Sequence, residues 1–415
     1  MDSSRTRNSI WAVVACTAIM SLLLTRFDTS MYETLKKYSS HGYSLLWLLE
    51  TLMFVLVPLP AVYFWRASGI KTAISWFILG YVALNPILWW ANSLELFPLQ
   101  LTVHLVTSAI QAALQTLLLL HLLKNSPYAQ RAFYLLTLLL VQGIARMLAN
   151  WIIPFSSDNH LLTLFINLVL ALIAFAVWRK ASIEDNPESF EERLEIDEWT
   201  RKIEEIGKSE ENENPPNTLA QEEMPLRERL GEYSHFMWGI GAIFCFHLTE
   251  YFFGQIYSLK CESDYYYYSL RGMIFLAAYF MGRFWVKGEP QSVTRLGRIA
   301  SMLCLLLVSL LPFAPTATLP FLLLICQCFV PCLGVFLLEL ATRKLGAHLP
   351  RAIAWAQIAT GLGYLGGACV SFGIEMKNSN EIKDAANPIF YLLLAALACS
   401  FLVLTYYFTK KSRVE

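Results

Sequence analysis

Four ionisable side chains lie inside long apolar stretches of this sequence, namely Glu50, Arg146, Glu250 and Arg271. A charge inside the hydrocarbon of a membrane costs at least about 2.5 kcal/mol, so residues of this kind indicate a functional site. At a helical rise of about 1.5 Å per residue, each of the four lies about 9 to 12 Å below the predicted outer end of its helix. We therefore expect them to share one layer of the membrane.

Two kinds of chemistry fit these residues. His247 precedes Glu250 by three positions, which places both side chains on one helix face about a turn apart. A histidine and a carboxylate in that arrangement can exchange protons near neutral pH, as proton-coupled transport requires. Arg146 and Arg271 could bind a carboxylate or phosphate group of a solute, and Glu50 completes the predicted substrate site.

A structural interpretation of the same residues stays open. Glu50 would pair with Arg146 and Glu250 with Arg271, or the long side chains would reach the lipid interface. Neutral or weakly basic side chains in the apolar stretches could line a pathway, although in membrane helices they more often hydrogen-bond a neighbouring helix. These residues are His104, Gln111, Gln142, Gln327 and Gln357.

The elements that must position these residues are membrane-spanning helices. Of the 415 residues, 56% are hydrophobic and only 15% are charged. Crossing a bilayer takes about 20 mostly apolar residues. Twelve stretches meet that requirement, at residues 9–25, 43–65, 72–92, 100–123, 131–154, 159–178, 233–256, 264–286, 296–314, 318–341, 351–374 and 387–409. The sequence thus predicts an all-α polytopic membrane protein with twelve transmembrane helices in two six-helix bundles.

An acidic segment divides the chain at its middle. Residues 183–232 hold 17 of the 32 Asp and Glu residues, and Pro215 and Pro216 interrupt any helix there. We therefore predict an N-terminal bundle at 1–178, an acidic cytoplasmic linker at 179–232 and a C-terminal bundle at 233–415. A solvated linker is the simpler interpretation, and a regulatory docking segment is the alternative.

The distribution of basic residues predicts the orientation. With the N-terminus inside, 24 Lys and Arg residues lie on the inner side and 6 lie in outer loops, as the preference for cytoplasmic positive charge requires. Both termini are then cytoplasmic, in a plasma membrane or a bacterial inner membrane. The first apolar stretch lacks a cleavage site of small residues after Leu24, so we expect it to be a retained helix and not a signal peptide.

Two familiar motifs have structural explanations here. Gly361, Gly363 and Gly366 form a G-x-G-x-x-G pattern, which binds dinucleotides where a strand turns into a helix. In this chain the pattern and the adjoining Gly367 lie inside the eleventh apolar stretch, so we expect close helix packing. Three cysteines of the tenth stretch, Cys326, Cys328 and Cys332, lack a second ligand pair and also indicate packing. We expect neither a cofactor nor a metal.

Two basic segments occupy corresponding places in the halves. Arg66, Gly69 and Lys71 follow the second predicted helix, and Arg295, Gly297 and Arg298 follow the eighth. In these segments and in its two halves the chain resembles the major facilitator superfamily, whose motif G-x-x-x-D-R-x-G-R-R lies at both places. The acidic residue of the motif is absent from both copies. The resemblance implies gating by these loops, helices five and eight facing each other across a central cavity, and helix eleven packing against helix two.

The function predicted from these observations is secondary active transport. The expected partners are a small polar, possibly anionic, organic solute, a coupling proton and the lipid bilayer, with no nucleic acid and a monomeric state. One alternative is a transporter-shaped receptor or scaffold without transport activity, which the degenerate motifs leave open. The other is an intramembrane enzyme, for which no H-E-x-x-H motif or paired Asp cluster is present.

Overall fold

The computed structural model describes most of the apolar part of the chain. The described residues are 8–23, 42–94, 96–127, 130–156, 160–181, 236–248, 277, 279–280, 290–313, 319–342, 349–375 and 388–414. Within these ranges the regular structure is entirely helical. Most of the acidic linker and most of the eighth predicted span lie outside the described residues.

The first half consists of helices that follow the first six predicted spans. They are Asn8–Leu23, α2 (Gly42–Leu56), α3 (Pro58–Ser68), α4 (Ile70–Ser93), α5 (Phe97–Asn125), α6 (Arg131–Ser156) and α7 (His160–Lys180). The second predicted span differs from the expectation because it is divided. Its two parts, α2 and α3, are bent by 42° where Val57 separates them.

The second half repeats this plan. Its described helices are Phe236–Leu248, α11 (Pro290–Leu310) with the short 3₁₀ turn η2 (Leu311–Phe313), α12 (Leu319–Thr342), α13 (Leu349–Glu375) and α15 (Pro388–Val414). They correspond to the seventh predicted span and to the ninth through the twelfth. The described helices are therefore those expected of two six-helix bundles.

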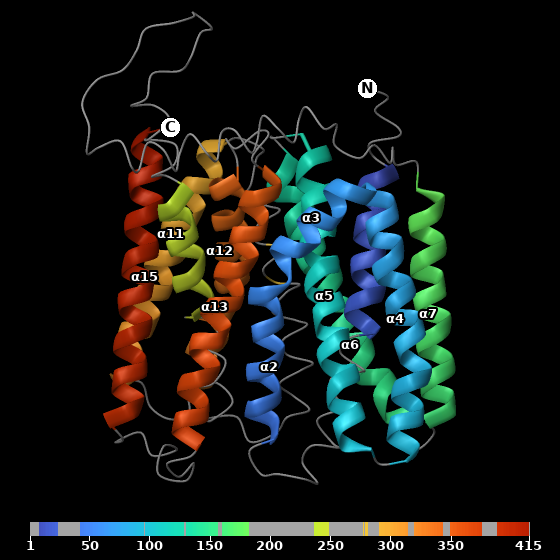
Figure 1. The fold of residues 1–415 in the computed structure, drawn as a ribbon. Helices are drawn as coiled ribbons and strands as arrows, with labels where there is room; N and C mark the ends of the chain where they lie inside the picture. The colour runs from blue at the N-terminus through green and yellow to red at the C-terminus, as the bar shows by residue number, and fades with distance from the viewer. Residues whose placement is uncertain are drawn as a thin grey trace, which may run out of the picture.

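The two halves stand side by side with their helices nearly parallel (Figure 1). In the first half α4 packs against α5 and α7, and in the second α11 packs against α12 and α15. Contacts between the halves involve α13 with α2, α3 and α5, and α12 with α6. Helix Asn8–Leu23 begins at the same end of the bundle at which α15 finishes, as an even number of crossings requires.

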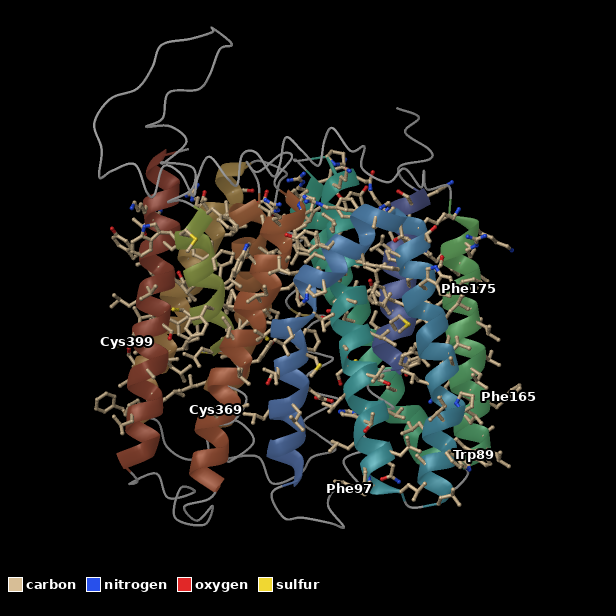
Figure 2. The ribbon with its side chains drawn as sticks, in the orientation of Figure 1. Trp89, Phe97, Phe165, Phe175, Cys369 and Cys399 are labelled. Atoms are coloured by element: carbon tan, nitrogen blue, oxygen red, sulfur yellow. The ribbon has the colours of Figure 1, made fainter. Side chains whose placement is uncertain are left out.

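Length and composition identify several described helices as membrane spans. Four qualify outright, and the bent pair α2 and α3 gives a fifth if it forms one span. Large apolar side chains on the outside of the bundle support this: Trp76 is 62% exposed and Phe165 64%. Phe165 points away from the bundle (Figure 2). Side chains of this kind need a lipid environment, so the chain is a multi-pass membrane protein.

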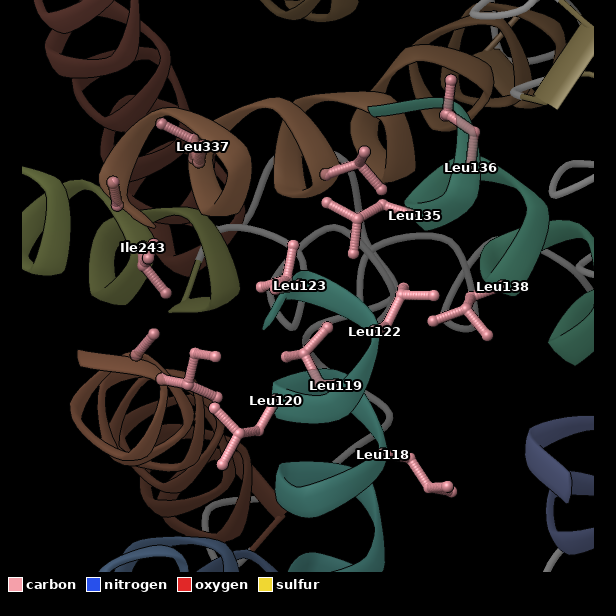
Figure 3. Packing of buried hydrophobic residues seen from close by; sticks show 14 of the residues in the cluster. Leu118, Leu119, Leu120, Leu122, Leu123, Leu135, Leu136, Leu138, Ile243 and Leu337 are labelled. Carbon is pink, nitrogen blue, oxygen red and sulfur yellow. The ribbon is translucent and has the colours of Figure 1, made fainter. Parts of the chain in front are cut away.

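Leucines join the halves near one end of the molecule. We call it the basic end, because α3, α5, α7 and α15 finish there and their last turns contribute basic residues such as Lys124 and Arg179. Leu119, Leu120 and Leu123 of α5 belong to one continuous core with Ile243 and Leu337 of the second half. Figure 3 shows these side chains converging from the two halves. The halves are thus packed together at the basic end.

Glycines set the closest helix approaches within the second half. A Cβ atom built on Gly363 of α13 would lie 2.8 Å from the carbonyl oxygen of Phe244 and 3.0 Å from the amide nitrogen of Leu248. Both are backbone atoms of helix Phe236–Leu248, which cannot rotate away as a side chain does. Gly241 of the same helix has no atom within 4 Å of its built Cβ.

We predict that Gly363→Ala destabilises the protein and that Gly241→Ala does not. The added methyl group must separate two backbones, which costs about 1 to 3 kcal/mol as overpacking does in other well-packed interiors. Thermal unfolding of the purified variants in detergent measures the difference. Equal unfolding temperatures for Gly363→Ala and the wild type would contradict this packing.

Candidate functional site

The candidate site is built around α2, because this helix contacts elements of both halves. Its partners are α5 of its own half and α13 of the other half, and α5 and α13 also contact each other. Three helices therefore meet near the middle of the molecule. Polar groups that any of them carries at this place can respond to the relative position of the halves.

Glu50 of α2, which is partly buried, and His104 of α5, which is buried, form a pair. The His104 Nε2 atom lies 2.5 Å from the Glu50 Oε1 atom, with the side chains 1% and 16% exposed. An ionised carboxylate is costly in hydrocarbon, and a histidine that donates or shares a proton reduces the cost. With one proton added to the ring, the pair is electrically neutral overall. The structure thus places a carboxylate and an imidazole in direct contact between two membrane helices.

The sequence suggested other partners for both residues. We expected Glu50 to bind solute or to pair with Arg146, and His104 more often to serve packing. The structure brings Glu50 and His104 together, although 54 positions separate them in the chain. The backbone of Arg146 lies in α6, but its side chain lies outside the described residues.

The break after α2 lies two helical turns from Glu50. Pro58 and Pro60 have no amide proton, so the carbonyl groups of Phe54 and Leu56 lose the donors that a continuous helix would supply. Hydrogen bonds of helical spacing persist on both sides of Val57. Its amide donates to the Met53 carbonyl at 3.0 Å, and its carbonyl accepts from the Ala61 amide at 3.0 Å. The break is therefore a local bend in one span.

Gly361 of α13 covers the carbonyl group that Pro58 leaves without its helical donor. A Cβ atom built on Gly361 would lie 2.9 Å from the Phe54 carbonyl carbon and 3.0 Å from its oxygen. The absence of a side chain allows the two backbones to touch, and a Cα–H group can act as a weak donor to a carbonyl oxygen. The bend in α2 and the glycine in α13 are thus complementary parts of the contact between the halves.

The predicted proton residue His247 lies on the other side of α13. Its ring centre is 5.0 Å from that of Tyr364, with the rings tilted. A Cβ atom on Gly363 would lie 2.9 Å from the His247 Cβ atom, and one on Gly366 would lie 3.3 Å from the Leu248 side chain. Gly367 is buried in the same helix. Glu250, the expected partner of His247, and Arg271 lie outside the described residues.

The first basic segment requires a correction, because its residues were expected in a loop. Arg66 is buried in the last turn of α3, and Lys71 is in the first turn of α4. Gly69 alone separates these helices, and its φ of 81° is a conformation that favours glycine. The Lys71 Nζ atom donates to the Ala181 carbonyl at 3.0 Å, next to the end of α7. This contact lies within the first half.

The second basic segment was also misplaced. Arg295, Gly297 and Arg298 lie in the first turns of α11 and not in a loop. A Cβ atom on Gly297 would collide with the ring of Phe408 in α15, so this glycine allows close packing within the second half. Membrane helices here extend past their apolar portions into the basic segments. A gating role for the six residues stays a prediction.

Comparison with solved structures identifies the fold. The chain is similar to a transporter of the major facilitator superfamily, FucP, in its outward conformation, with a TM-score of 0.65 and 13% identity over 96% of this chain and 97% of that one. It is similar to the human organic anion transporter MFSD10 (TETRAN), with a TM-score of 0.68 and 12% identity over 96% and 99%. A structure of the Escherichia coli fucose:proton symporter FucP gives 0.62 and 14% over 98% and 96%.

These likenesses confirm the predicted major facilitator fold of two six-helix bundles. At such low identity they show the fold alone. No family model matches the sequence. No curated protein matches it by sequence either.

We predict that removing one member of the Glu50–His104 pair destabilises the protein more than removing both. His104→Ala leaves a buried carboxylate without its partner, at a cost of about 3 kcal/mol, whereas Glu50→Ala combined with His104→Ala leaves no charge. Unfolding temperatures of the two single variants and the double variant at pH 7 give the interaction energy. Additive losses would show that the two side chains do not stabilise each other.

Proposed function

We propose that this chain, which has the fold of major facilitator superfamily transporters, is a secondary active transporter. It would move a small polar solute across the membrane, driven by a proton gradient. The observation that supports this most directly is the Glu50–His104 pair, a carboxylate and an imidazole in contact between membrane helices. Its position beside the contact of α2 with α13 would let its protonation state respond to movement of the halves.

The proposed mechanism follows from the cost of charge in the membrane. A protonated pair is neutral overall and can be enclosed, whereas the deprotonated pair carries a net negative charge and favours contact with water. The halves would therefore change orientation with the proton and the solute bound together, and the solute-free halves would return after the proton has left, with the charged pair in contact with water. Transport of solute is then coupled to the proton because each complete cycle moves one proton with each solute.

The solute site is proposed between the halves. Arg146 and Arg271, which we predicted for substrate charge, stay candidates there, as does His247 with Glu250 for a further proton step. One solved structure of this fold is named a fucose:proton symporter and another an organic anion transporter, so the fold accommodates both kinds of solute. We infer that the chain acts without enzymatic chemistry.

We predict that Glu50→Gln abolishes proton-driven accumulation but keeps exchange of solute. Glutamine cannot release a proton, so the pair would remain neutral and the halves could still reorient. The measurement uses proteoliposomes with an imposed pH gradient and a panel of labelled sugars, organic anions, amino acids and nucleosides. Counterflow, in which no net proton movement is needed, is measured in parallel.

A matched control comes from the same helix. His121 of α5 packs its ring against Trp178, with ring centres 5.6 Å apart. Because that contact lies at the basic end and away from the pair, His121→Gln should leave the pH dependence unchanged, whereas His104→Gln should alter it. Undiminished proton-driven uptake by Glu50→Gln would refute the coupling role. Absence of uptake of every solute by the wild type would favour the scaffold alternative.

A further inference from the structure

Helix α13 carries three stripes of side chains with different surroundings, and one of them is polar. Successive residues of a helix are rotated by about 100°, so positions separated by three, four or seven share a face. One stripe contains Trp355, Leu362 and Cys369, which are all exposed. Trp355 is 47% exposed and Leu362 41%. In a membrane protein an exposed stripe of this composition contacts lipid.

The glycines define the neighbouring faces of α13. Gly361 faces the backbone of α2, and Gly363 and Gly366 face helix Phe236–Leu248. The exposed stripe lies on one side of α13, between these two neighbours. The face that remains lies on the opposite side of the helix; α13 also contacts α3, α5 and α12.

The remaining face holds Ile353, Gln357, Thr360 and Tyr364, spaced by four, three and four residues. Ile353, toward the basic end, is 0% exposed, in keeping with the closure of the halves there. Gln357, Thr360 and Tyr364, farther from that end, are all partly exposed. Three polar side chains on a face turned away from lipid indicate contact with water inside the protein.

We propose that Gln357, Thr360 and Tyr364 form a binding subsite for a neutral polyhydroxylated solute such as a monosaccharide or polyol. We call these three residues the α13 polar stripe. The assignment deepens the proposed transport function and rests on it, since the stripe would line the solute pathway between the halves. The basic segments and the Glu50–His104 pair do not by themselves predict this solute class.

The chemistry of the α13 polar stripe selects this class of solute. The Gln357 amide supplies both donors and an acceptor. The Thr360 hydroxyl donates to the Ala356 carbonyl at 2.9 Å, which leaves its oxygen able to accept. The Tyr364 ring packs against the His247 ring, with the ring centres 5.0 Å apart, and its partly exposed remainder is an aromatic surface. A sugar ring has hydroxyl groups at its edge and an apolar C–H face that can pack on such a surface.

The test measures water access and occupancy without requiring transport. Gln357→Cys, Thr360→Cys and Tyr364→Cys are treated with a charged, membrane-impermeant thiol reagent in proteoliposomes. We expect labelling about tenfold above that of the parent chain, because a thiol in contact with water forms the reactive thiolate. Leu362→Cys is the matched control on the lipid stripe, where native Cys369 already lies, and should label no faster than the parent.

Protection by solutes then tests the chemical class. Neutral monosaccharides and polyols should slow the labelling of Thr360→Cys, and simple carboxylates should not. Labelling of Leu362→Cys as fast as the stripe positions would overturn the assignment of a water-lined face. Protection by carboxylates but not by neutral solutes would overturn the solute class. Failure of proton-driven uptake with intact protection would instead reject the coupling and keep the subsite.

Discussion

The structure depends on one constraint, which is that hydrocarbon supplies no hydrogen bonds. Each polar group placed among the membrane helices must therefore find its partner within the protein. The carbonyl group of Phe54 loses its helical donor to Pro58 and lies against the backbone of Gly361. The carboxylate of Glu50 lies against the ring of His104. The first contact joins α2 to α13 and the second joins it to α5. The requirement that polar groups be satisfied therefore also fixes the neighbours of α2.

The glycines of α13 show how context decides the meaning of a motif. The same spacing that holds a pyrophosphate at a strand-to-helix turn here removes side chains from two faces of one continuous helix. Gly361 admits the backbone of α2 from the first half, and Gly363 admits the backbone of helix Phe236–Leu248 from the second. Both contacts are close because neither face carries a side chain at these positions.

The sequence predicted the fold, whereas it did not predict the contact of Glu50 with His104, for physical reasons. Span length and apolar composition follow from the thickness of the bilayer, so the described helices fall where hydropathy places them. Pro58 and Pro60 indicate the break after α2, whereas the hydropathy pattern does not. The basic segments were placed in loops because helices continue beyond their apolar portions. The pairing of Glu50 with His104 depends on the rotation of two helices about their axes, and a single sequence contains no measure of that rotation.

The position of the pair relative to the bend gives the proposed cycle a structural basis. Glu50 lies in α2, the part of the bent span that is farther from the basic end, and α3, the part beyond Val57, packs against α13. A change in the charge of the pair would alter how firmly α2 is bound to α5, while Gly361 holds the middle of the span against the opposite half. Movement of α2 about its bend would then change its contacts with both halves at once. Because this route needs no acidic residue in the basic segments, the loss of that residue from both motif copies is compatible with a working transport cycle.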